Sequence, residues 1–192
     1  MAQDSIGKYK MVVVGGSAGS LDAVMKIVAA MRPGIETSFV IIVHRGGANE
    51  SVLEELLSTK TELPVQKVED KEEIRKGTIY VAPPDYHLLL DDEHTISLDT
   101  SEKVHHSRPS IDVTFESAAE VYGPSLVGIL LSGANEDGAE GLLRIAELGG
   151  HTIVQNPVTA DVGFMPQSAL NLLSTHVVLN GDEIGEYLRG LL

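Results

Sequence analysis

A short strand sequence that runs into a glycine-rich turn constrains the fold of this chain most. Residues 11–14 are Met-Val-Val-Val, an apolar and mostly β-branched run that is typical of a strand covered on both faces of a parallel sheet. Two glycines follow, and apolar residues then recur at helical spacing from Leu21. The sequence therefore predicts a strand, a tight turn and a helix. Ser17 would lie at the tip of that turn, beside backbone N–H groups that point toward a ligand.

Three interpretations of this turn compete. Ser17 could simply cap the helix, as serine often does. The turn could be a phosphate or dinucleotide loop, but Ser17 occupies the second glycine position of G-x-G-x-x-G and no G-K-[ST] follows. Residues 15–19, Gly-Gly-Ser-Ala-Gly, fit the G-x-S-x-G pattern of a nucleophile elbow. The last interpretation requires a base and an orienting acid at the ends of other strands.

The rest of the chain alternates buried-type strands with amphipathic helices. Strands are predicted at residues 39–43, 78–82, 125–131, 152–155 and 176–179, and helices at 50–58, 111–121, from about 139 onward, and 182–191. This alternation is typical of βαβ units. The predicted fold class is α/β: a doubly wound, mostly parallel sheet with helices on both faces and an antiparallel β-hairpin near residues 87–98. Residues 69–76 are expected to be a solvated connector, and 156–167 a loop.

Polar side chains follow the ends of two further strands. His44 comes directly after strand 39–43, and Asp137 lies in a glycine-rich turn after strand 125–131. Carboxyl ends of parallel strands share one sheet edge, so Ser17, His44 and Asp137 form a candidate catalytic triad. An imidazole can take the serine proton, and a carboxylate can fix the imidazole tautomer. The alternatives are a structural hydrogen-bonding role for His44 and helix capping by Asp137.

The order Ser–His–Asp along the chain differs from the orders of α/β-hydrolases, chymotrypsin and subtilisin. The chain instead resembles the catalytic domain of the chemotaxis protein-glutamate methylesterases, the CheB family, from about Tyr9 to Glu183. The matching blocks are residues 14–19, 43–44, 77–83, 106–113, 130–141, 149–153 and 165–166.

The resemblance implies removal of methyl groups from glutamate side chains on the cytoplasmic helices of bacterial chemoreceptors, with release of methanol. It places the nucleophile at Ser17, the base at His44, and the orienting acid at Asp137. Backbone oxyanion contacts fall at Ala18 and Ala134. The family needs no metal and no organic cofactor.

We expect Arg108 and Met165 to line an open substrate cleft. Alternatives to the methylesterase are a receptor glutamine deamidase, another protein esterase, and a non-catalytic binding module on the same fold.

Three departures from the family pattern surround the predicted site. Ala18 stands where many members have Thr, residues 132–135 read Ser-Gly-Ala-Asn where many read Thr-Gly-Met-Gly, and residues 45–47 read Arg-Gly-Gly where many read Met-Pro-Pro. These changes bear on substrate preference more than on the triad, and they motivate the binding-module alternative.

Composition narrows the remaining choices. We expect 192 residues to form a single catalytic domain over residues 1–192, with 1–9 disordered and with no receiver domain, so that a receiver-domain regulator would act in trans. A net charge of −14 argues against nucleic acid as a partner, and the absence of cysteine excludes thiolate catalysis. No apolar run reaches the roughly 18 residues of a membrane span and no secretory signal is visible, so we expect a cytoplasmic protein without membrane insertion.

Overall fold

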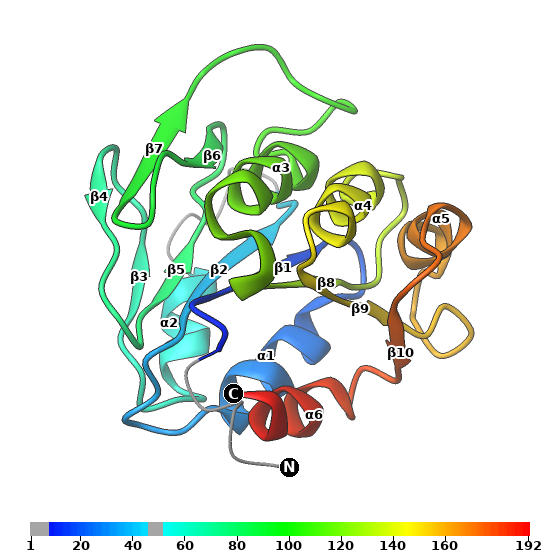
Figure 1. Ribbon diagram of the computed structural model, residues 1–192, viewed down its shortest axis with the longest axis horizontal. Helices are drawn as coiled ribbons and strands as arrows, with labels where there is room; N and C mark the ends of the chain where they lie inside the picture. Colours follow the sequence, from blue (N-terminus) through cyan, green and yellow to red (C-terminus); the bar gives the residue numbers. More distant parts are fainter. Residues whose placement is uncertain (1–7, 46–51) are drawn as a thin grey trace.

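A computed structural model describes residues 8–45 and 52–192 of the chain. Its larger sheet has seven strands in the order β10-β9-β8-β1-β2-β5-β3, and every neighbouring pair is parallel (Figure 1). The strands are β1 (Met11–Gly16), β2 (Ser38–Val43), β3 (Val65–Lys67), β5 (Ile79–Val81), β8 (Leu126–Leu130), β9 (His151–Gln155) and β10 (Val177–Leu179). Because the central strands are covered on both faces, the burial pattern of β1 is continuous rather than alternating.

Helices cover both faces of this sheet (Figure 1). One face carries α3 (Ile111–Tyr122), α4 (Ala139–Glu147) and α5 (Phe164–Leu172); the other carries α1 (Leu21–Ala30), α2 (Val52–Ser58) and α6 (Ile184–Leu191). Successive side chains of β1 point to opposite faces, so Met11 and Val13 join the first core while Val12 and Val14 join the second. The predicted doubly wound α/β fold is confirmed.

The predicted hairpin belongs to a second, antiparallel sheet. β6 (His87–Leu90) pairs with β7 (Thr95–Asp99), and β4 (Glu72–Glu73) pairs with the other edge of β7. The hairpin is therefore confirmed, but the prediction that residues 69–76 form only a connector is wrong. β4 was missed because a two-residue charged strand carries no apolar alternation from which a strand could be predicted.

Helix α5 also corrects the prediction, which treated residues 156–167 as a loop. Pro166 lies in the first turn of α5, where a proline costs no helical hydrogen bond. Met165, Ala169 and Leu173 follow at a spacing of four residues and are buried in the core below α5. This spacing is the sequence pattern that could have predicted the helix.

At the N-terminus, the expected disorder of residues 1–9 is wrong for Tyr9, which is buried and whose carbonyl accepts a hydrogen bond from Thr37. Residues 1–7 lie outside the described part, as do 50–51 of the helix predicted at 50–58. Within the described ranges, no helix is both long enough and apolar enough to cross a bilayer.

Strand β1 lies between β2 and β8. The strands β2, β3 and β5 lie on one side of β1, and the later strands β8, β9 and β10 lie on the other, so the chain changes sides at β1. In open parallel sheets, ligands bind at the carboxyl ends of the strands beside such a switch point. Helix α3 packs directly over this place: a Cβ atom added to Gly15 would lie 2.4 Å from Ile111 Cγ2 and 3.1 Å from Phe115 Cζ. The close packing fixes the start of α3 over the end of β1.

We therefore expect Gly15→Ala to destabilise the protein by about 1–3 kcal/mol, because the added methyl group overpacks the contact between β1 and α3. The matched control is Gly190→Ala on α6, where an added Cβ meets nothing within 4 Å and helix propensity favours alanine by up to about 1 kcal/mol. Urea unfolding midpoints measure both changes. Equal midpoints for the two variants would contradict this packing.

Candidate active site

Ser17 follows β1 directly and is held by its backbone. Its N–H donates to the Ser132 carbonyl at 2.9 Å, and its carbonyl accepts from the N–H and hydroxyl of Ser20 at 3.1 and 2.8 Å. The N-cap of α1 is Ser20, and the Ser17 hydroxyl makes no hydrogen bond within the described part of the chain. The structure therefore gives the Ser17 side chain no capping role, and leaves its hydroxyl half-buried and unpaired.

His44 lies at the corresponding position after β2. The register pairs Gly16 with Val43, and the His44 N–H donates to the Gly16 carbonyl at 3.1 Å, so Ser17 and His44 are neighbours at one sheet edge. The His44 side chain is 13% exposed, and its Nε2 lies 2.7 Å from Asp137 Oδ2. Because an ionised carboxylate only accepts, Nε2 carries the proton of this bond, and Nδ1 is the nitrogen left to act as a base.

Asp137 is completely buried and accepts four hydrogen bonds. The donors are His44 Nε2, the Ser110 hydroxyl at 2.8 Å, and the N–H groups of Ile111 and Asp112 at 2.7 and 3.0 Å. Two of these groups belong to the first turn of α3, where the helix dipole favours negative charge. Asp137 therefore caps α3 and not α4, the helix that follows it in sequence and whose N-cap is Gly138.

The environment keeps Asp137 ionised. Burial acts to raise the pKa of this carboxyl, but the hydrogen bonds from His44, the Asp112 and Ile111 amides and Ser110 outweigh burial and hold its pKa below the ordinary value. An ionised Asp137 can both orient the His44 ring and stabilise a positive charge that forms on it.

Asp112 is a second buried carboxyl at this site. Its Oδ1 accepts from the Gly141 N–H at 2.7 Å, which ties α3 to α4, and its Oδ2 lies 3.3 Å from His105 Nε2. Burial and the nearby charge of Asp137 raise the pKa of Asp112 to about 6. The two carboxyls thus differ in their environments, and the geometry assigns only Asp137 to His44.

Two backbone N–H groups near Ser17 belong to exposed residues, Ala18 in the same turn and Ala134 in the turn after β8. Among the described residues, neither the Ala18 nor the Ala134 N–H has a protein acceptor. The N–H of Gly133, the residue before Ala134, instead donates to the Val162 carbonyl at 3.0 Å. Ala18 and Ala134 thus have the free donors that an oxyanion would require.

Ser132 is a site residue that the sequence analysis missed. Its buried hydroxyl donates to the Ala18 carbonyl at 2.7 Å and accepts from the Val162 N–H at 2.9 Å, and its own N–H donates to Gln155 Oε1 at 2.9 Å. The side chain therefore holds the turn after β1 against the turn after β8. Its position directly after a strand end was the available sequence indication.

Arg108 and Met165 lie in different surroundings. Arg108 borders a hollow that His44 also lines, and its Nη1 donates to the carbonyls of Thr100 and Ser101 at 3.0 and 2.9 Å. Met165 is fully buried, and a Cβ on Gly133 would lie 2.5 Å from its Cε. The structure does not place Met165 on the cleft surface; Met165 supports the Gly133 backbone from below.

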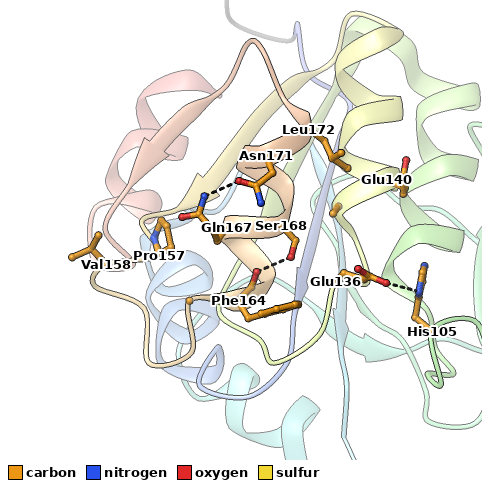
Figure 2. Close-up of a pocket in the computed structure, with 12 residues that line it drawn as sticks. His105, Glu136, Glu140, Pro157, Val158, Phe164, Gln167, Ser168, Asn171 and Leu172 are labelled. Carbon is orange, nitrogen blue, oxygen red and sulfur yellow. Dashed lines mark hydrogen bonds and ion pairs between the residues drawn. The ribbon is translucent and has the colours of Figure 1, made fainter.

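Hollows lie on both sides of the loop that carries His105 and His106. A groove of 820 Å³ runs between α4 and α5, with His105 and Glu136 at one end and Phe164 on its wall (Figure 2). On the other side is a hollow of 450 Å³ that includes His44, His106 and Arg108. The two adjacent histidines thus face different hollows, and within the described ranges no three acidic or histidine side chains are grouped to hold a metal ion.

Comparison with known proteins places this chain in a family. The model of the family described as "CheB methylesterase" matches residues 12–188. The chain belongs to the CheB methylesterase family. The crystal structure of the CheB methylesterase catalytic domain of Thermotoga maritima superposes with a TM-score of 0.90 at 30% sequence identity, covering 96% of this chain and 99% of that chain.

Relatives differ in how much of their length this chain matches. A Leptospira interrogans protein named "Putative protein-glutamate methylesterase/protein-glutamine glutaminase" is 42% identical over 178 residues, which are 93% of this chain and 92% of that protein. The protein-glutamate methylesterase FrzG of Myxococcus xanthus is 33% identical over 180 residues, 94% of this chain but 54% of that protein.

We expect Asp137→Asn to lower the free energy of unfolding by about 2–3 kcal/mol at pH 7, because it replaces a charged acceptor of four hydrogen bonds. The folded state lowers the pKa of Asp137. The ionised carboxylate therefore stabilises the fold fully above the ordinary carboxyl pKa, and this stabilisation is lost as the pH falls through the folded-state pKa. The difference in free energy of unfolding between wild type and Asp137→Asn, called the gap below, should narrow as the pH is lowered from 7 toward 3.

Urea unfolding at a series of pH values measures this gap. Asp182→Asn, at an exposed turn position, is the control and should leave a gap near zero throughout. A gap for Asp137→Asn that stays constant with pH would show that the carboxylate charge does not stabilise the fold.

Proposed function

We propose that this protein hydrolyses the γ-methyl esters of glutamate side chains on bacterial chemoreceptors and releases methanol. The observation that carries the proposal is the buried 2.7 Å contact between His44 Nε2 and Asp137 Oδ2, next to an unpaired serine hydroxyl on the neighbouring strand end. The printed names of relatives, protein-glutamate methylesterase among them, support the same reaction.

In the first half of the proposed reaction, His44 Nδ1 takes the proton of the Ser17 hydroxyl as its oxygen attacks the γ-carbonyl carbon. The free N–H groups of Ala18 and Ala134 donate to the oxygen that becomes negative. Each such donor typically lowers the activation barrier by about 3–4 kcal/mol. Asp137 stabilises the His44 imidazolium. The imidazolium then gives its proton to the methoxy oxygen, methanol leaves, and the glutamyl group remains on Ser17.

In the second half, water takes the place of the alcohol. His44 accepts a proton from the water as it attacks the acyl carbon, and returns that proton to the Ser17 oxygen when the acyl bond breaks. The products are a glutamate carboxylate and the original enzyme. No step requires a metal or an organic cofactor.

Glutamine deamidation is a second candidate activity, because relatives carry the name protein-glutamine glutaminase. A glutamine side chain presents the same γ-carbonyl with an amine in place of the methoxy group, and His44 would protonate that leaving group as ammonia. The acyl-enzyme and its hydrolysis would be identical.

We place the reaction in the cytoplasm, on the cytoplasmic helices of the receptor, and we propose that the chain acts as one catalytic domain. A receiver-domain protein acting in trans is the proposed regulator. The net charge of −14 disfavours nucleic acid as a further partner.

Methanol release from methylated chemoreceptor tests the proposal. We expect Ser17→Ala to reduce the rate by about 10³-fold or more, since loss of the nucleophile removes the acyl-enzyme route. Ser174→Ala, an exposed serine after α5, is the matched control and should retain the wild-type rate.

Release that survives Ser17→Ala would contradict the assignment of the nucleophile. If wild-type protein releases ammonia but no methanol, the chain is a deamidase. If it releases neither yet binds receptor, the binding-module alternative is correct.

A further inference from the structure

The hollow that His44 lines collects positive charge in a strongly acidic chain. We call it the basic hollow; it is bordered by His44, Arg45, Lys103, Arg108, Asp85 and His106. The chain has 14 Lys and Arg residues against 28 Asp and Glu residues, yet among the described residues three of the cations and one of the acids border this one place. Such a local field is opposite in sign to that of the whole chain.

Two of these three cations have no carboxylate partner among the described residues. Arg45 is neutralised, because its Nη2 lies 2.8 Å from Glu54 Oε1. Arg108 donates to two backbone carbonyls, which hold its guanidinium in place without removing its charge. Within the described ranges, neither Lys103 nor Arg108 forms an ion pair, and the Lys103 side chain is exposed.

The groove on the other side of the site has the opposite character. Glu136 and Glu140 line it together with Phe164 and Leu172, whose side chains are 57% and 42% exposed (Figure 2). Neither Lys nor Arg is among the described residues on its walls. A carboxylate on the substrate would be repelled there and attracted into the basic hollow.

We propose that the basic hollow is a subsite for a carboxylate side chain that flanks the methyl ester, and that this charge difference sets the direction in which the substrate segment crosses the triad. The inference rests on the proposed function, and adds to it the substrate class: an ester-bearing segment with a neighbouring acidic residue. Lys103 and Arg108 recognise that residue, and His44 lines the same hollow.

Two synthetic peptides test the subsite. Each carries one glutamate γ-methyl ester; the first has flanking glutamates, and the second has glutamines at the same positions. We expect wild-type protein to favour the acidic peptide by about 5- to 10-fold in kcat/KM, through KM rather than kcat, as for a partly exposed charge pair in a concave site. The preference should fall as ionic strength rises.

Lys103→Gln is the informative variant, because this exposed side chain has no hydrogen bond or ion pair to any described residue whose loss would disturb folding. In Lys103→Gln, the ratio of kcat/KM for the acidic peptide to kcat/KM for the glutamine peptide should fall toward one. In Lys103→Glu, the preference should reverse to favour the glutamine peptide. Lys60→Gln, at an exposed position after α2, is the matched control and should keep the wild-type ratio. A wild-type ratio of one or less, or the same fall for the Lys60 and Lys103 variants, would overturn the proposal.

Binding to Ser17→Ala protein separates this inference from the proposed function. If wild-type protein releases no methanol from either peptide but Ser17→Ala binds the acidic peptide at least 5-fold more tightly, the esterase proposal fails and the subsite stands. If methanol is released equally from both peptides, the esterase stands and the subsite fails.

Discussion

The Asp137 carboxylate joins the three parts of the structure that make the site. It lies in the turn after β8, accepts hydrogen bonds from the first two N–H groups of α3, and is hydrogen-bonded to His44 at the end of β2. A buried charge is stable only when it is paired and hydrogen-bonded, so the start of α3, the Ser110 hydroxyl and the imidazole must all be in place. The position of α3 depends in turn on Gly15, which lets that helix approach β1. Fold and site are therefore set by one network.

Most of the strands and both layers of helices could be predicted because they depend on local pattern, whereas the order of the strands in the sheet and the edge strand β3 were not predicted. Apolar runs such as residues 39–43 indicate strands buried on both faces, and their carboxyl ends must share one edge. Ser17 and His44 each follow one of these strand ends, so their positions at the same edge could be predicted. The contact between Asp137 and α3 could not be predicted, because it joins residues 26 positions apart along the chain whose approach depends on how α3 packs over the sheet.

Errors in the prediction occurred where local pattern was weak or misleading. Pro166 resembled a loop residue although it lies in the first turn of α5, and the two charged residues of β4 carry no apolar alternation. Met165 was expected to meet substrate, yet it supports Gly133 from within the core, which fixes the turn that presents the Ala134 N–H. Departures from the family pattern at Ala18 and Ala134 are compatible with the proposed oxyanion contacts, because those contacts would use only backbone N–H groups.

Covalent labelling by a fluorophosphonate tests most directly whether this network activates Ser17. Peptide mass spectrometry locates the label, and the labelling rate is compared among wild type, Ser17→Ala and Asp137→Asn. We expect a label on Ser17 in wild type, none in Ser17→Ala, and labelling slower by up to about 10⁴-fold in Asp137→Asn, where His44 loses the charged acceptor that fixes its tautomer. Labelling of Ser17 at the same rate in wild type and Asp137→Asn would show that Asp137 does not activate Ser17 through His44.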